Sequence, residues 1–127
     1  WGIAYALASS SDYQLDRIVV REGGYCSLHR HLDKDNLFLV RRGRLRVTWL
    51  TDNGEESTEL TPTSDPLCIP AGVLHRFLGL AATSEVFELY TSETDRPVRR
   101  DDILREEPGG MLANAPLSSL PDIEGAV

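Results

Sequence analysis

The chain contains few residues of several types, and each scarcity excludes a class of protein. Two cysteines, Cys26 and Cys68, are too few for a disulfide framework and lie in no CxxC motif, so a reducing cytoplasm is the expected location. No apolar run approaches the roughly 20 residues of a membrane-spanning helix, so no membrane partner is expected. Lysine and arginine total 13 against 20 acidic residues, a net charge of −7, which excludes a nucleic-acid-binding face.

The length of 127 residues fits one domain, and its pattern predicts an all-β fold. Short apolar segments rich in β-branched and aromatic residues alternate with turn signals, of which Asp52-Asn53-Gly54 is the strongest hairpin signal. Eight strands are predicted, at residues 16–21, 26–31, 36–41, 44–50, 57–60, 66–69, 75–80 and 85–90. These are enough strands for a closed barrel.

Only the C-terminal part of the sequence departs from this pattern. Residues 101–105, with two acidic residues first and an arginine last, favour one helical turn whose charges complement its dipole. After Glu107 the chain becomes rich in proline, glycine, serine and alanine. We therefore expect a barrel domain over residues 1–110 and a tail over 111–127 that is flexible or packed on a partner subunit.

The chain has three histidines, and their placement predicts a metal site. His29 and His31 alternate within one predicted strand, so both imidazoles project onto the same face. His75 begins a later apolar strand that barrel closure can bring opposite the first pair. Three neutral imidazoles suit a divalent ion such as Zn, Mn, Ni or Fe and leave an open coordination position. The alternative is that all three are ordinary surface or hydrogen-bonded histidines.

The spacing around these histidines matches a known pair of motifs. Gly23, five residues, His29-Arg30-His31, four residues, Asn36, six residues and Gly43 resemble the first cupin motif. The segment Ile69-Pro70-Ala71-Gly72-Val73-Leu74-His75 resembles the second, in which proline, glycine and histidine recur at these intervals. The resemblance implies the cupin double-stranded β-helix, a jelly-roll barrel, with His29, His31 and His75 as metal ligands.

Further strings narrow the resemblance. Trp1-Gly2, residues 17–20, Ser27-Leu28-His29 and residues 101–105 are similar to the cupin domain of type II mannose-6-phosphate isomerases and related small cupins, over about residues 1–110. This implies metal-dependent aldose–ketose isomerisation of a sugar or sugar phosphate. The same fold serves many functions, so the resemblance alone does not establish one.

Asn36 is the main departure from the first motif, because the family pattern has a glutamate ligand there. An amide oxygen can coordinate a metal but is neutral and one methylene shorter, so metal affinity is expected to be lower. Asp35 is the second choice for the fourth ligand, although it would place Asn36 on the opposite strand face. In the second motif, Ser64 and Gly79 replace a glycine and an asparagine.

Strand alternation selects the side chains that would line a pocket around the metal. Tyr25 and Ser27 share a face with His29, and Phe77 shares one with His75. Phe38 shares a face with Asn36. These residues, with Tyr90, are the predicted substrate contacts.

Glu88 is the predicted catalytic base, flanked by apolar residues that would raise its pKa. The phase of its strand is open, so Glu88 pointing to solvent or to a subunit contact is the alternative. Arg42, Arg44 and Arg46 form either a fork for a substrate anion or the solvated face of a strand.

The sequence leaves three functions open. The first is a metal-dependent sugar or sugar-phosphate isomerase or epimerase. The second is a non-catalytic cupin that binds a sugar or another small ligand, and the third is an Fe(II)-dependent dioxygenase. Exposed apolar residues, including Leu37, Leu39, Trp49 and the N-terminal segment, also predict a homodimer joined through one sheet.

Overall fold

The structure is a computed structural model that describes residues 1–92 and 103–115. Over these residues it contains strands and turns and no helix. The first six strands are β1 (Gly2–Ser9), β2 (Tyr13–Arg21), β3 (Gly24–Tyr25), β4 (Leu28–His31), β5 (Lys34–Arg42) and β6 (Leu45–Thr51). The other six are β7 (Gly54–Leu60), β8 (Leu67–Ile69), β9 (His75–Gly79), β10 (Thr83–Ser92), β11 (Ile103–Glu107) and β12 (Gly110–Met111).

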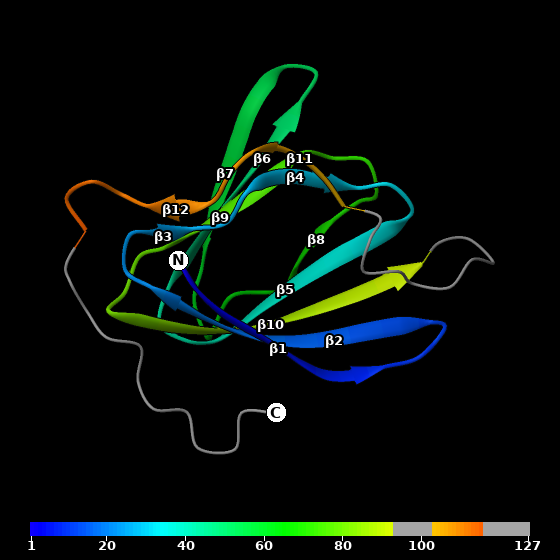
Figure 1. The fold of residues 1–127 in the computed structure, drawn as a ribbon, viewed down its shortest axis with the longest axis horizontal. Coiled ribbons are helices and arrows are strands. Elements are labelled where there is room, and N and C mark those ends of the chain that lie inside the picture. Colours follow the sequence, from blue (N-terminus) through cyan, green and yellow to red (C-terminus); the bar gives the residue numbers. More distant parts are fainter. Residues whose placement is uncertain (93–102, 116–127) are drawn as a thin grey trace.

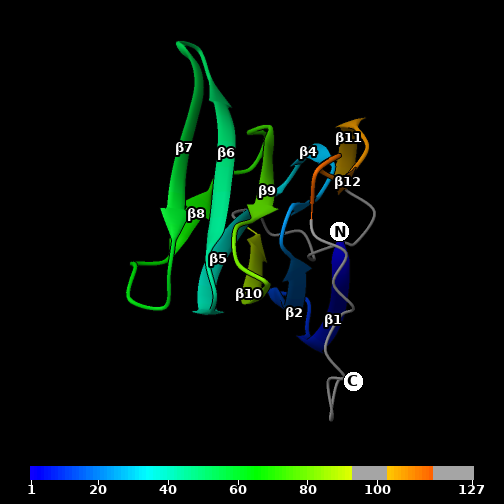
Figure 2. The same cartoon turned by 90° about the vertical axis from the view of Figure 1, so that its left-hand side faces the viewer.

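Two antiparallel sheets form the walls of the molecule (Figure 1). The first has five strands in the order β1-β2-β10-β5-β8 and lies in the lower half of the view. The second sheet has seven strands. Five follow the path β11-β4-β9-β3-β12, while β6 pairs with β9 and β7 pairs with β6. Figure 2 shows β1 and β7 at opposite sides of the molecule.

The core lies between the two sheets and follows from strand alternation. Burial alternates with a period of two along β9 and along the first residues of β5, because successive side chains point to opposite faces. The buried apolar side chains come from both sheets and form one cluster: Ile18, Val20, Cys26, Phe38, Val40, Leu45, Val47, Leu60, Ile69, Phe77 and Val86.

Two glycines meet requirements of the turns that join these strands. Gly54 has a φ of +116° and follows Asn53 in the tight connection between β6 and β7, which confirms the predicted hairpin. Gly43 has a φ of +82°, and a Cβ there would lie 2.5 Å from the carbonyl oxygen of Thr83. The chain therefore needs glycine both for the conformation and for the close approach of β10.

All eight predicted segments overlap strands, but the segment at 26–31 is broken. Cys26 and Ser27 lie between β3 and β4 and belong to neither, so one continuous strand is wrong there. The helical turn predicted at 101–105 is wrong over residues 103–105, which start β11, and residues 101 and 102 lie outside the described residues. Pairing of β11 with β4, distant in the sequence, outweighs the local preference.

The predicted tail begins with residues that pack on their own chain. Met111 belongs to β12, which pairs with β3, and the backbone N–H of Leu112 donates to the carbonyl of Gly23 at 2.8 Å. Residues 116–127 lie outside the described part, so the domain boundary at 110 and the role of the tail stay predictions. None of the described residues forms a helix long and apolar enough to span a bilayer.

Candidate metal centre

The three histidines converge from two neighbouring strands. His29 on β4 stands directly opposite His75 on β9, and His31 follows two residues later on the same face of β4. One ring nitrogen from each lies within 4.8 Å of the others, and all three side chains are buried. Three converging imidazole nitrogens are a typical ligand set for a divalent transition metal.

Backbone carbonyls orient two of the rings for metal binding. His29 Nδ1 lies 2.7 Å from the carbonyl oxygen of Ser27, and His75 Nδ1 lies 2.8 Å from that of Val73. A carbonyl only accepts, so in each ring Nδ1 carries the proton and Nε2 presents its lone pair.

Burial keeps the same rings neutral, which is the form that binds a metal. Desolvation lowers the pKa of His29 from 6.5 against the opposing hydrogen bond to Ser27. Desolvation and the charge of neighbouring His29 lower the pKa of His75 to about 4. At neutral pH neither ring needs to lose a proton before it binds an ion.

Asn36 is the polar side chain that completes this cluster. It points inward from β5, is 1% exposed, and its Nδ2 lies 3.2 Å from His75 Nε2. Its Oδ1 is buried with no hydrogen-bond partner among the described residues. Asp35 instead accepts a hydrogen bond from the backbone N–H of Ala71 at 2.9 Å. The amide nitrogen is the atom that faces His75, so Oδ1 could act as a weak fourth metal ligand only after the amide turns about its Cβ–Cγ bond.

A cavity adjoins the histidines and contains most of the predicted substrate contacts. Its volume is about 360 Å³, and its lining includes His29, Ser27, Phe77, Glu88 and Tyr90. A neighbouring hollow of about 300 Å³ is lined by His31 and shares several lining residues with the cavity: Ala4, Asp16, Tyr90 and Ile103. The two hollows are neighbours beside the histidines, and each is of a size for a small molecule.

Glu88 faces the cavity, and its surroundings raise its pKa to about 7. The dominant cause is desolvation, since the side chain is 4% exposed, and hydrogen bonds from Tyr90 and Asn36 act in the opposite direction. The hydroxyl of Tyr90 donates to the Glu88 carboxylate, and burial beside that charge raises the pKa of Tyr90 well above 10. A buried carboxyl with this pKa suits proton transfer near neutral pH.

Two predicted contacts lie outside the cavity lining. Tyr25 is on the other face of its sheet, where the guanidinium of Arg76 lies 5.1 Å from its ring centroid. The break at Cys26 and Ser27 shifts the alternation, so Cys26 rather than Tyr25 faces the interior. Phe38 is 1% exposed in the core, and its ring lies 6.0 Å from that of His75. Phe38 therefore packs beside His75 in the core and does not line the cavity.

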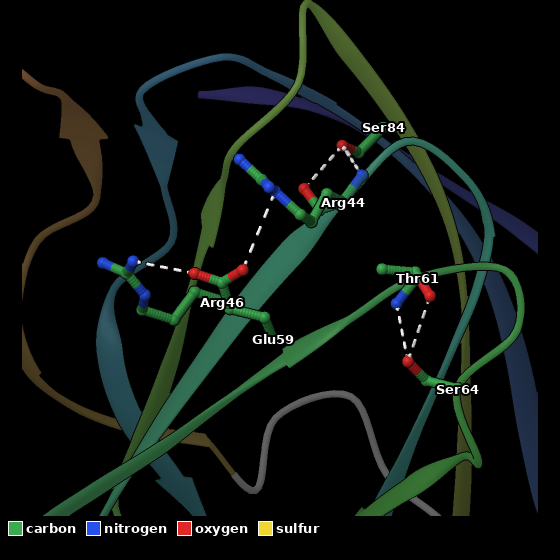
Figure 3. Close-up of polar contacts among 6 residues, drawn as sticks. All are labelled: Arg44, Arg46, Glu59, Thr61, Ser64 and Ser84. Carbon is green, nitrogen blue, oxygen red and sulfur yellow. Dashed lines mark hydrogen bonds and ion pairs between the residues drawn. The ribbon is translucent and has the colours of Figure 1, made fainter.

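The arginine stripe is paired on the outside of the molecule. Figure 3 shows Arg44 and Arg46 both directed at Glu59 on the neighbouring strand β7, at 3.8 and 3.0 Å. Neither arginine lines either of the two hollows beside the histidines. Of the two alternatives for this stripe, the structure favours the solvated face.

Ser64 shows how one departure from the second motif is accommodated. Its hydroxyl accepts a hydrogen bond from the backbone N–H of Thr61 at 2.9 Å (Figure 3). Its own N–H donates to the Thr61 carbonyl at 3.0 Å. The side chain thus closes a turn without glycine.

Sequence reasoning missed several residues of the site. Lys34, the single lysine of the chain, is 3% exposed, lines the hollow with His31, and its Nζ lies 4.7 Å from the Tyr90 ring centroid. The alternation that places Asn36 inward also places Lys34 inward, so that signal was present. Asp16, opposite Glu88 across β2 and β10, lines both hollows. Only strand pairing brings Asp16 to the site.

Comparisons with known proteins agree with this fold. No family model matches the chain. A mannose-1-phosphate guanylyltransferase of Sinorhizobium fredii is 26% identical over 122 residues, covering 96% of this chain and 21% of that protein. The chain therefore spans about a fifth of that relative's length.

Several solved structures superpose on most of the chain. Oxalate decarboxylase from Bacillus subtilis matches with a TM-score of 0.69 at 16% identity, covering 82% of this chain and 28% of that one. The capsular polysaccharide assembling protein CapF from Staphylococcus aureus matches with 0.66 at 23%, covering 84% and 30%. KdgF from a Halomonas species matches with 0.62 at 22%, covering 72% and 81%. The chain thus has the cupin fold, with a three-histidine cluster that could hold a metal.

Proposed function

We propose that this cupin domain is a metal-dependent isomerase or epimerase of a sugar or sugar phosphate. The observation that carries the proposal is a buried carboxyl, Glu88, lining the same cavity as His29 and hydrogen-bonded to Asn36. A metal site beside a proton-transfer group is the minimum that such a reaction needs. Similarity to a protein named for a sugar phosphate supports the substrate class.

His29, His31 and His75 would hold the divalent ion, with Asn36 as a weak fourth ligand. Zn, Mn, Ni and Fe all suit imidazole, and the donor set does not select among them. A bound ion would polarise the substrate carbonyl and stabilise negative charge on its oxygen.

Glu88 would move the proton in this reaction. In the isomerisation its carboxylate takes the proton from the carbon beside the carbonyl and returns it to the former carbonyl carbon, while the proton of the adjacent hydroxyl passes to the carbonyl oxygen, so the enzyme ends unchanged. The hydroxyl of Tyr90 donates to Glu88 and holds it in place. Asp16, opposite Glu88, keeps a second carboxylate at the cavity wall.

Lys34 would give the site its preference for an anionic sugar. Its ammonium is buried against the Tyr90 ring and lines the hollow that also contains His31. A compact positive charge in this place suits a phosphate group. Ser27 and Phe77 would contact the remainder of the substrate.

A non-catalytic sugar-binding cupin is the second candidate, and Asn36 is the observation that favours it. Three imidazoles and one amide leave a divalent ion without a charged ligand, which reduces its binding. A protein that only binds a sugar, without turning it over, does not need a tightly held ion. In either case we place the protein in the cytoplasm, since two cysteines outside any CxxC motif are too few for a disulfide framework.

Solvent proton exchange separates the two candidates. The metal-loaded protein is incubated in D₂O with mannose 6-phosphate and, separately, mannose 1-phosphate, and deuterium at carbons 1 and 2 of the recovered sugars is measured by NMR. The isomerase predicts incorporation from mannose 6-phosphate that is lost in Glu88→Gln and kept in Glu59→Gln, an exposed glutamate of β7. Saturable binding of the sugars without any incorporation would contradict catalysis and support the second candidate.

A further inference from the structure

The outer edge of β1 differs from the other sheet edges in the described part of the molecule. β1 ends its sheet, and within residues 1–92 and 103–115 no strand pairs with its second edge. Its sequence, GIAYALAS, contains no charged residue and no proline. The side chains of Ile3 and Leu7 are 36% and 39% exposed.

The other edges carry features that prevent strands from pairing with another molecule. β8 is three residues long and β12 is two residues long. β7, with the sequence GEESTEL, and β11, with ILREE, are strongly charged. A long, uncharged edge is left only at β1, so this edge is suited to pairing.

The register of β1 with β2 identifies the backbone groups on its free edge. The N–H of Arg21 donates to the carbonyl of Trp1 at 3.0 Å, so these two residues form a hydrogen-bonded pair. Such pairs recur every second residue in an antiparallel ladder, which makes Ile3 and Tyr5 the next residues bonded to β2. The N–H and C=O groups of the residues between them therefore point away from β2: Gly2, Ala4 and Ala6.

We propose that β1 pairs antiparallel with β1 of a second copy of the chain, with Ala4 opposite Ala4 of the second copy. This register places Gly2 opposite Ala6 and satisfies the free groups of both strands about a two-fold axis. An uncharged strand is self-complementary, since no like charges meet. The register shift between Ala6 and Ala8 bends the strand and ends the pairing there.

This surface is one part of the surface expected for a homodimer, namely the N-terminal segment. Of the other residues named for that surface, Leu39 is 40% exposed, Leu37 is half-buried and Trp49 packs against the core. β1 also borders the candidate site, since Ala4 lines both hollows and Ala6 lines one. The second copy would therefore lie beside these hollows.

Amide hydrogen exchange tests the register directly in the wild-type chain. At about 1 mM protein, the amides of Ala4 and Ala6 are expected to exchange at least about tenfold more slowly than at about 1 μM. The amides of Ile3 and Tyr5 are the internal control, because they bond to β2 in monomer and dimer alike. Rapid exchange at Ala4 and Ala6 at both concentrations would overturn the proposal.

Light scattering during size-exclusion chromatography provides the second test. Ala4→Pro removes an N–H on the free edge and leaves the β1–β2 bonds intact, a position where a strand tolerates proline. The variant is expected to elute as a monomer at a concentration where wild type and the control Ala4→Ser are dimers. A monomeric wild type, or an Ala4→Pro variant that stays dimeric, would overturn the proposal.

Discussion

Replacing Glu88 by glutamine should stabilise the metal-free protein above neutral pH. Burial raises the pKa of Glu88 from 4.5 to about 7. Between these values the folded chain keeps a proton that the unfolded chain releases, so stability falls as pH rises. The difference between the two pKa values corresponds to a loss of about 3 kcal/mol in the free energy of unfolding above pH 7. Glutamine is neutral at every pH and avoids this loss.

Urea denaturation in EDTA at pH 5 and pH 8.5 measures the effect. Glu88→Gln is expected to exceed wild type by about 3 kcal/mol at pH 8.5 and by less than about 1 kcal/mol at pH 5. Glu59→Gln is the control, because Glu59 forms surface ion pairs and should change stability by about 1 kcal/mol or less at either pH. A Glu88→Gln variant no more stable than wild type at pH 8.5 would refute the claim that burial raises the pKa of the Glu88 carboxyl.

Three further substitutions test other parts of the account. Glu85→Ala should lower the unfolding free energy by about 2 kcal/mol in urea denaturation, because two arginines lose a nearly buried partner. Phe38→Ala should cost about 3–5 kcal/mol by the same assay, since its ring fills the core behind His75. Asn36→Glu should tighten zinc binding about tenfold or more in calorimetry, and unchanged affinity would place Asn36 outside the coordination sphere.

The sequence could predict the histidine cluster because its signals are local. Alternation places His29 and His31 on one face, and the two motifs specify the strands that carry them and His75. The fold follows from the same turns and motifs. Alternation also extends to Lys34, which lies two residues before Asn36 on β5 and is buried with it.

The remaining features depend on pairing between distant segments. A shift of one residue reverses the faces of a strand, so no local pattern fixes whether Glu88 points inward. The break at Cys26 and Ser27 moves Tyr25 to the outer face. Ile103 pairs with His31, and this contact outweighs the helical preference of its segment.

Metal content is the most direct test of the central claim, that three buried histidines form a metal centre. Protein prepared without a histidine tag is dialysed against zinc, freed of excess ion and examined by inductively coupled plasma mass spectrometry. About one ion per chain is expected in wild type, with a large loss in His75→Ala. No bound metal in wild type, or equal metal in both proteins, would contradict it.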